Sequence, residues 1–169
     1  MSAFRRDGGA VVAELAPGEV AVLSDLARQL VDLLEERAAE SPADVLFAQL
    51  GIGGPDAAPL DPALARLLPD AYRDDREAAS EHRHLTERAL VQRKIGNAHA
   101  VIASLAAAPA RLREAEVQSW LRTLTDLRLT IAARLQIETD DDEGIGDDAM
   151  LGIYDWLGYV QGSLLEVME

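Results

Sequence analysis

The chain has 169 residues, of which 49% are hydrophobic and 27% charged, and its formal net charge is −14. This composition excludes a disordered chain, and no apolar run approaches the roughly 20 residues that cross a bilayer. The lack of cysteine excludes disulfides, thiolate metal ligands and thiol nucleophiles. The length predicts one domain over residues 1–169, and the N-terminus is too polar for a signal peptide, so we expect a cytoplasmic protein.

The first elements are a hairpin and a helix. Residues 3–15 predict a small β-hairpin, because an Asp7-Gly8-Gly9 turn separates two short apolar runs. A helix is expected from Pro17 to about residue 38, since proline suits the first helical position and an acid such as Glu19 suits the first turn. Its apolar face is formed by Val20, Leu23, Ala27, Leu30 and Leu34.

The middle of the chain predicts three helices of unequal length. Short helices are expected over residues 45–50 and 61–68, each after a proline at its first position. A long helix is expected over about residues 74–107. Its first half is charged, and its second half carries a buried stripe of Val91, Ile95, Ala98, Ile102 and Leu105.

The helix expected over residues 114–138 has the clearest periodicity. Its apolar residues recur at heptad-like spacing: Val117, Trp120, Leu121, Leu124, Leu127, Ile131 and Leu135. Arg122 stands one turn before Asp126, where the two side chains can form an ion pair. Together these elements predict a mainly α fold, a helical bundle of about four substantial helices plus short helices, with the small N-terminal hairpin at one end.

The final helix, expected over residues 151–168, is apolar on two sides. Such a helix lies either at the centre of a bundle or between the domain and a partner. Glycines one turn apart, Gly158 and Gly162, indicate close approach of another element, either within the chain or from a second subunit. We predict a homodimer, and a protein interface that includes Tyr154, Trp156, Leu157, Gly158, Gln161 and Leu165.

Residues 138–148 form an acidic loop with seven carboxylates and no base. An EF-hand is excluded, because Gly146 at the sixth position would place Ile145 and Gly152 where acids are required. A solvated loop is one reading. The other is electrostatic contact with bases of the long helix or with a basic partner, which would involve Asp140, Asp141, Asp142, Glu143, Arg83, Arg88, Arg93 and Lys94.

Catalytic and nucleic-acid signals are weak. His82 and His84 are two residues apart and cannot form an i, i+4 metal pair, and no nucleophile stands at a motif spacing from a base. We therefore expect no catalytic, metal or cofactor site. Because DNA binding rests on neutralising phosphates, the acidic charge disfavours it. The sequence favours a non-enzymatic protein-interaction module with a regulatory role. The alternatives are a DNA-associated transcriptional regulator and an enzyme whose site only the fold assembles.

Short motifs in a fixed order resemble one known family. They are LAPGE at residues 15–19, LLPDAY at 67–72, WL at 120–121, DLRL at 126–129 and YDWL at 154–157, followed by Gln161. The chain is similar along nearly its whole length to the actinobacterial family catalogued as domain of unknown function two thousand and seventeen. The resemblance implies a cytoplasmic protein without established activity, often encoded beside the adaptor that feeds substrates to the Clp protease. Some members are labelled transcriptional regulators.

Overall fold

The computed structural model describes residues 2–40, 50, 54–107 and 109–169. Four long helices and a short one dominate this part of the chain, as the sequence predicts: α1 (Pro17–Ala39), α3 (Pro62–Leu67), α4 (Arg76–Ala106), α5 (Glu114–Arg134) and α6 (Asp148–Met168). The mainly α fold class is confirmed. The short helix predicted over residues 45–50 lies almost wholly outside the described residues.

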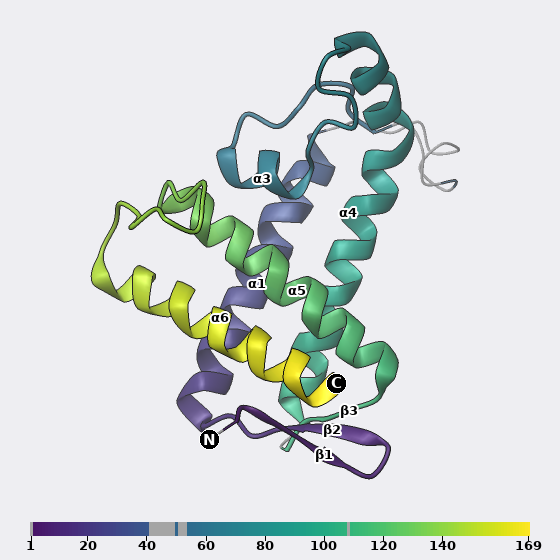
Figure 1. Ribbon diagram of the computed structural model, residues 1–169. Coiled ribbons are helices and arrows are strands. Elements are labelled where there is room, and N and C mark those ends of the chain that lie inside the picture. The colour runs from purple at the N-terminus through teal and green to yellow at the C-terminus, as the bar shows by residue number, and fades with distance from the viewer. Residues whose placement is uncertain (1, 41–49, 51–53, 108) are drawn as a thin grey trace.

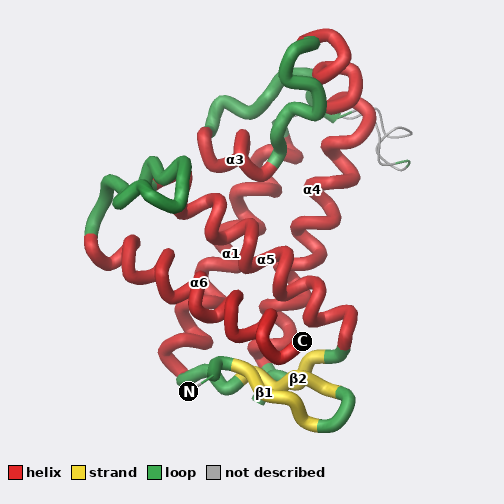
Figure 2. Tube along the Cα trace, viewed as in Figure 1, coloured by secondary structure: helices red, strands yellow, loops and turns green. Residues whose placement is uncertain are grey.

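The predicted hairpin is present and belongs to a three-stranded antiparallel sheet. Strands β1 (Phe4–Asp7) and β2 (Ala10–Ala13) pair with Phe4 opposite Ala13, and Gly8 in the turn has a φ of 63° that favours glycine. The third strand, β3 (Arg111–Leu112), pairs with β2. The sheet lies across one end of the helices (Figure 2), where Arg6 Nε donates to the Val167 carbonyl at 2.7 Å.

Helix α5 is the centre of the helical layer. It packs against α3, α4 and α6, while α1 packs along α4 on the other side. Figure 1 shows α6 crossing in front of α1 and running beside α5, with both chain termini at the end that carries the sheet. A hollow lies on each side of α5, one lined with α1 and α6 and the other with α4.

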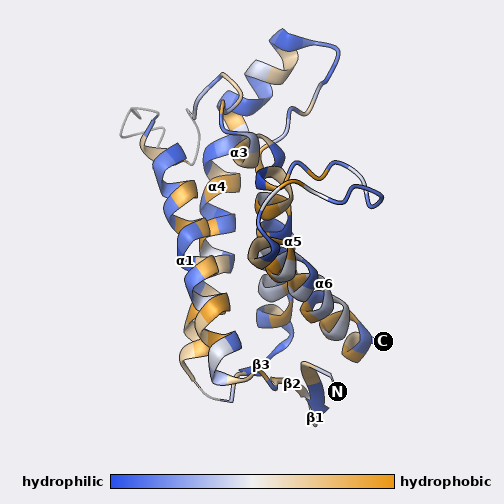
Figure 3. Ribbon diagram, turned by 90° about the vertical axis from the view of Figure 1, so that its left-hand side faces the viewer, coloured by the Kyte–Doolittle hydropathy of each residue, from blue (hydrophilic) through white to orange (hydrophobic). Residues whose placement is uncertain are grey.

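The core runs from the hairpin to the last helix. Trp120 on α5 is fully buried, meets Phe4 edge to face at 5.6 Å between ring centroids, and donates its indole N–H to Ser104 Oγ at 2.8 Å. Leu157 and Leu164 on α6 are also fully buried. Figure 3 shows hydrophilic residues along the outer edge of α1 and hydrophobic residues toward the rest of the molecule.

Two helix boundaries differ from the prediction. The fifth helix ends at Arg134 instead of residue 138, because Gln136 takes a left-handed φ of 58° and the Ile137 N–H turns back to the Ala132 carbonyl. The last helix begins at Asp148, three residues earlier than expected, because the Asp147 side chain accepts from the Met150 N–H at 2.7 Å and caps it.

The charged first half of α4 is partly internal. Glu87 Oε1 accepts from Arg83 Nη1 at 2.7 Å and from Arg37 Nη2 at 3.0 Å, and all three side chains are buried. Arg83 also donates to Asp70 and to the Leu68 carbonyl. This network ties α1, α4 and the chain that follows α3 together.

Candidate functional site

The six interface residues predicted on α6 do not share one exposed face. Leu157 is fully buried in the chain's own core, whereas Leu165 is 48% exposed. Tyr154, Trp156, Gly158 and Gln161 are half-buried. The homodimer itself remains a prediction, and within it Leu157 offers no surface to a partner.

Three of these residues surround Arg128 of α5. Its guanidinium carbon lies 4.9 Å from the centroid of the Tyr154 ring, and its Nη1 donates to Gln161 Oε1 at 3.2 Å. A side chain at Gly158 would meet the guanidinium at about 3.5 Å. The glycine spacing thus makes room for Arg128 within the chain, while nothing lies within 4 Å of a Cβ placed at Gly162.

Trp156 joins α6 to the start of α1. Its indole N–H donates to Glu19 Oε1 at 3.0 Å, and the other oxygen of Glu19 accepts from the Ala16 N–H that precedes α1. The same carboxylate therefore caps α1 and anchors Trp156. Glu19 and Trp156 both line a hollow between the two helices.

A large concave surface, the α1–α6 groove, lies between α1 and α6. Its wider part has a volume of about 670 Å³, with α5 as its floor. A second hollow of about 300 Å³ continues it past Ala149 and Ile153 toward Gly18, Val22 and Trp156. Apolar side chains dominate the wider part: Leu26, Leu30, Leu33, Leu127, Ile131, Ile145, Met150 and Ile153.

Acidic residues occur at and near this α1–α6 groove. Asp147 lines its wider part, Glu19 lines the second hollow, and Asp25, exposed on α1, accepts from the groove residue Gln29 at 2.9 Å. Asp32 and Glu36 are exposed further along α1. Asp147 and Asp148 stand at the start of α6. Arg134, the base that lines the groove, is held by both oxygens of Asp61 at 3.0 and 2.9 Å, and this contact lowers the pKa of Asp61.

The acidic loop, residues 138–148, is exposed but locally ordered. Asp142 Oδ2 accepts from the N–H groups of Thr139 and Glu138 at 2.9 and 2.7 Å, and these hydrogen bonds lower the pKa of Asp142. The Ile145 N–H returns to the Leu135 carbonyl at 2.6 Å. Asp140, Asp141 and Glu143 face solvent.

The four bases predicted to meet this loop have other surroundings. Arg83 belongs to the buried network with Glu87, and Arg88 lies where Gly54 hydrogen-bonds to α4. Arg93 and Lys94 line a cleft between α4 and α5. Within the described residues no hydrogen bond or ion pair links these bases to residues 138–148.

Lys94 pairs across the helices with Asp126 of α5 at 2.7 Å. Burial raises the pKa of the Asp126 carboxyl, and the hydrogen bond and charge of Lys94 oppose that rise. The expected partner of Asp126 within α5 was Arg122. Lys94 of α4 occupies that position instead. Periodicity along α5 could not predict this contact, because Lys94 belongs to another helix.

The described residues contain no group of three or more metal-binding side chains that could hold an ion, and none of their helices is long and apolar enough to span a membrane. The arrangement defines a class: a mainly helical bundle with one apolar and one polar groove flanking its central helix. The chain belongs to the family described as domain of unknown function DUF2017, whose model matches residues 1–168.

Relatives in this family carry a regulatory name. Proteins of Mycobacterium bovis and Mycobacterium tuberculosis called oxidative stress regulator AosR are 34% identical to the chain, over 96% of it and 84% of their own length. A Mycobacterium leprae protein called putative oxidative stress regulator AosR is also 34% identical, over 89% of this chain and 79% of its own. No solved structure matches the chain.

Proposed function

We propose that the chain is a non-enzymatic regulator that binds a basic amphipathic helix of a partner protein in the α1–α6 groove. The observation that carries this proposal is the groove itself, two adjoining apolar hollows whose linings include the carboxylates of Asp147 and Glu19. Recognition of an amphipathic helix by an apolar groove is a recurring mode of protein binding.

The apolar part of the groove supports a helix as the occupant. Val22 is 39% exposed although it faces the groove, and Ile145 at the far end is 67% exposed. Between them lie the half-buried apolar residues Leu26, Met150 and Ile153. Exposed apolar residues gathered at a concave surface are characteristic of interaction surfaces. Covering them would bury apolar area at about 25 cal/mol per Å².

The charge at the groove determines the chemistry of the partner. Asp25, Asp32 and Glu36 are exposed on α1, Glu19 and Asp147 line the two hollows, and Asp148 is exposed at the start of α6. Arg134 is already paired with Asp61. A helix with lysine or arginine beside its apolar stripe complements these carboxylates, whereas an acidic helix is repelled.

The relatives' name supports a regulatory role in oxidative stress. The 169 residues contain no cysteine, so in this chain such a role cannot rest on its own thiol chemistry. The proposed mechanism is therefore association with a partner, whose own chemistry supplies any redox sensitivity. A cytoplasmic location is part of the same proposal.

The test uses a leucine–lysine amphipathic helical peptide, and the same peptide with glutamate replacing lysine, in binding titrations against the whole chain. Only the lysine peptide should bind, and Ile153→Asp and Val22→Asp should each weaken it at least tenfold. Both substitutions make the protein more negative, so mere charge attraction predicts equal or tighter binding. Such a result would contradict the proposal.

A second copy of the chain is the competing occupant. Sedimentation equilibrium decides between the two: if the groove is free for a partner, Ile153→Asp should leave the mass of the particle in solution unchanged, whether that particle is a monomer or the predicted homodimer. A dimer that Ile153→Asp converts to a monomer, and that the peptide also dissociates, would assign the groove to self-association.

A further inference from the structure

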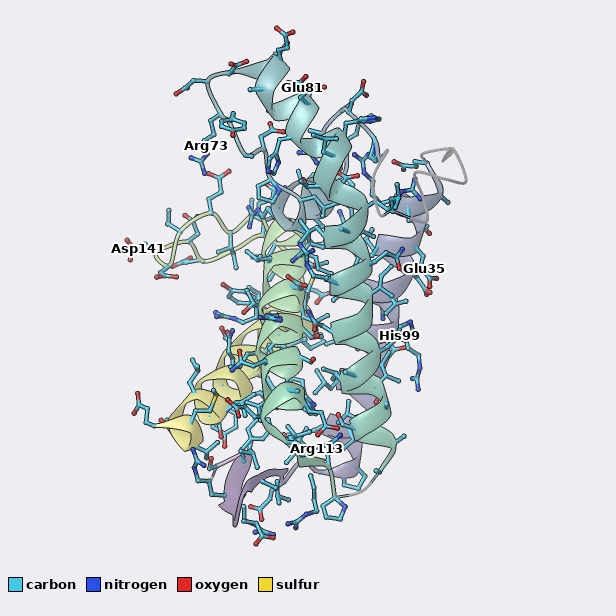
Figure 4. The ribbon with its side chains drawn as sticks, turned by 90° about the vertical axis from the view of Figure 1, so that its right-hand side faces the viewer. Glu35, Arg73, Glu81, His99, Arg113 and Asp141 are labelled. Atoms are coloured by element: carbon cyan, nitrogen blue, oxygen red, sulfur yellow. The ribbon has the colours of Figure 1, made fainter. Side chains whose placement is uncertain are left out.

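The cleft between α4 and α5 is lined by three bases and one acid, although the chain as a whole is acidic. It has a volume of about 470 Å³, and its polar lining comes from Arg93, Lys94, Asn97, Arg122, Thr125 and Asp126. Three cationic side chains therefore face one carboxylate, in a chain whose net charge is −14. Figure 4 shows α4 and α5 side by side, with His99 on the side of α4 away from α5.

The hydrogen bonds already made in the cleft leave mainly donors unused. Lys94 uses one of its three N–H groups on Asp126, which is nearly buried. Asn97 accepts from Ser119 through Oδ1, which leaves its amide N–H₂ free. Within the described residues, neither Arg93 nor Arg122 has a hydrogen-bond or ion-pair partner.

We propose that this α4–α5 cleft binds a phosphorylated small molecule of nucleotide size. The guanidinium groups of Arg93 and Arg122 match phosphate oxygens in two-pronged geometry, and Lys94 and Asn97 add donors from one wall. The volume is within the range of small-molecule sites. Leu90 and Leu121, which also line the cleft, give the organic part of the ligand an apolar surface.

The pair of Lys94 and Asp126 fixes the floor of the site. Because the carboxylate holds the ammonium group in place, Lys94 is positioned before the ligand arrives. A duplex is a poorer occupant than a small ligand. Specific DNA binding requires several neutralised phosphates, and the surrounding charge of the chain opposes the approach of a polyanion.

The experiment titrates the whole chain with inorganic phosphate, pyrophosphate and a nucleoside diphosphate by calorimetry. The double variant Arg93→Gln, Arg122→Gln should bind pyrophosphate at least tenfold more weakly. The matched control, Arg73→Gln with Arg76→Gln, removes the same charge from exposed residues outside the cleft and should bind within twofold of the unmodified chain. Circular dichroism confirms that both variants keep their helices.

The outcomes distinguish this site from general charge attraction. Equal weakening in the two double variants, or no saturable binding of any of the three probes, would overturn the proposal. Tighter binding of the nucleoside diphosphate than of pyrophosphate assigns the ligand as a nucleotide, and equal binding assigns phosphate recognition alone. If a DNA duplex bound more tightly than all three probes, and if the double variant Arg93→Gln, Arg122→Gln no longer bound it, the cleft would instead be a nucleic-acid site.

Discussion

The two grooves beside α5 share a helix and differ in almost everything else. On one side, Leu127 and Ile131 belong to a mainly apolar groove whose lining includes the carboxylate of Asp147. On the other side, Arg122 and Asp126 belong to a polar cleft with an excess of positive charge. The comparison teaches that one amphipathic helix can serve two surfaces when its neighbours, α6 and α4, contribute opposite chemistry.

The difference also separates the two proposals. Binding in the α1–α6 groove combines apolar area with charge complementarity, so it should weaken with salt less than binding in the α4–α5 cleft does. The α4–α5 cleft depends on charge and should weaken as salt screens it, since the screening length falls to about 8 Å at physiological ionic strength. Binding in one groove can therefore be weakened by substitution without changing binding in the other.

The largest expected effect comes from weakening the packing of α5, the helix that both grooves share. Trp120 is fully buried on α5 and contacts Phe4. Trp120→Ala should lower the free energy of unfolding by about 3–5 kcal/mol, as large-to-small substitutions of aromatic core residues do. Urea denaturation measures this, with Trp156→Phe in the half-buried position as the milder comparison. A loss below about 1 kcal/mol would mean that α5 is not the common support.

Crossing the variants sharpens the comparison. The Ile153→Asp variant should bind the lysine peptide at least tenfold more weakly and should bind pyrophosphate with unchanged affinity. The double variant Arg93→Gln, Arg122→Gln should bind pyrophosphate at least tenfold more weakly and should bind the lysine peptide with unchanged affinity. Titration of each variant with each probe gives four affinities, and a variant that lost both probes while remaining folded would show that the grooves are not independent.

The pH dependence of stability tests the floor of the polar cleft. The pKa of Asp126 is raised in the folded chain, so its favourable contribution is complete below the ordinary value of 3.8 and is lost as pH rises through the raised value. The stability advantage of the unmodified chain over Asp126→Asn should therefore shrink as pH increases from about 4. Urea titrations at successive pH values measure it. An advantage that grows with pH would mean that the attraction of Lys94 outweighs burial.

The smallest effect compares two glycines of α6. Neither Gly152 nor Gly162 has an atom within 4 Å of an added Cβ, so either change to alanine should stabilise the chain by about 0.5–1 kcal/mol. Gly152 lines the α1–α6 groove and Gly162 does not. Thermal unfolding should give equal gains, while peptide affinity should fall a few-fold in Gly152→Ala alone. An equal fall in both would place the peptide elsewhere on α6.

Local pattern was sufficient to predict most of the fold. Proline at the start of α1 and the heptad-like spacing around Trp120 identify helices whose bounds agree with the structure to within a few residues. The two-residue strand β3 was missed, because so short a strand has no periodicity of its own. The left-handed turn at Gln136 was missed as well, since glycine is the usual signal for that conformation.

The surfaces were less predictable than the fold. The sequence indicates that α6 is apolar on two sides. It does not indicate that Leu157 faces the core while Ile153 lines a groove with α1. The charged run of α4 gave no sign that Arg83 and Glu87 are buried and that Arg93 lines a cleft. These facts depend on which helix lies beside which, and a single sequence does not encode that in a local period.

The two tryptophans provide the most direct measurement of the central claim, that the α1–α6 groove receives a basic helix. The chain has two indole N–H groups, one in the core at Trp120 and one in the groove at Trp156. In nitrogen-15 correlation spectra, the lysine peptide should shift the Trp156 indole signal saturably and leave the Trp120 signal in place. Pyrophosphate should move neither. A peptide that binds without shifting Trp156, or that shifts both signals equally, would contradict the account.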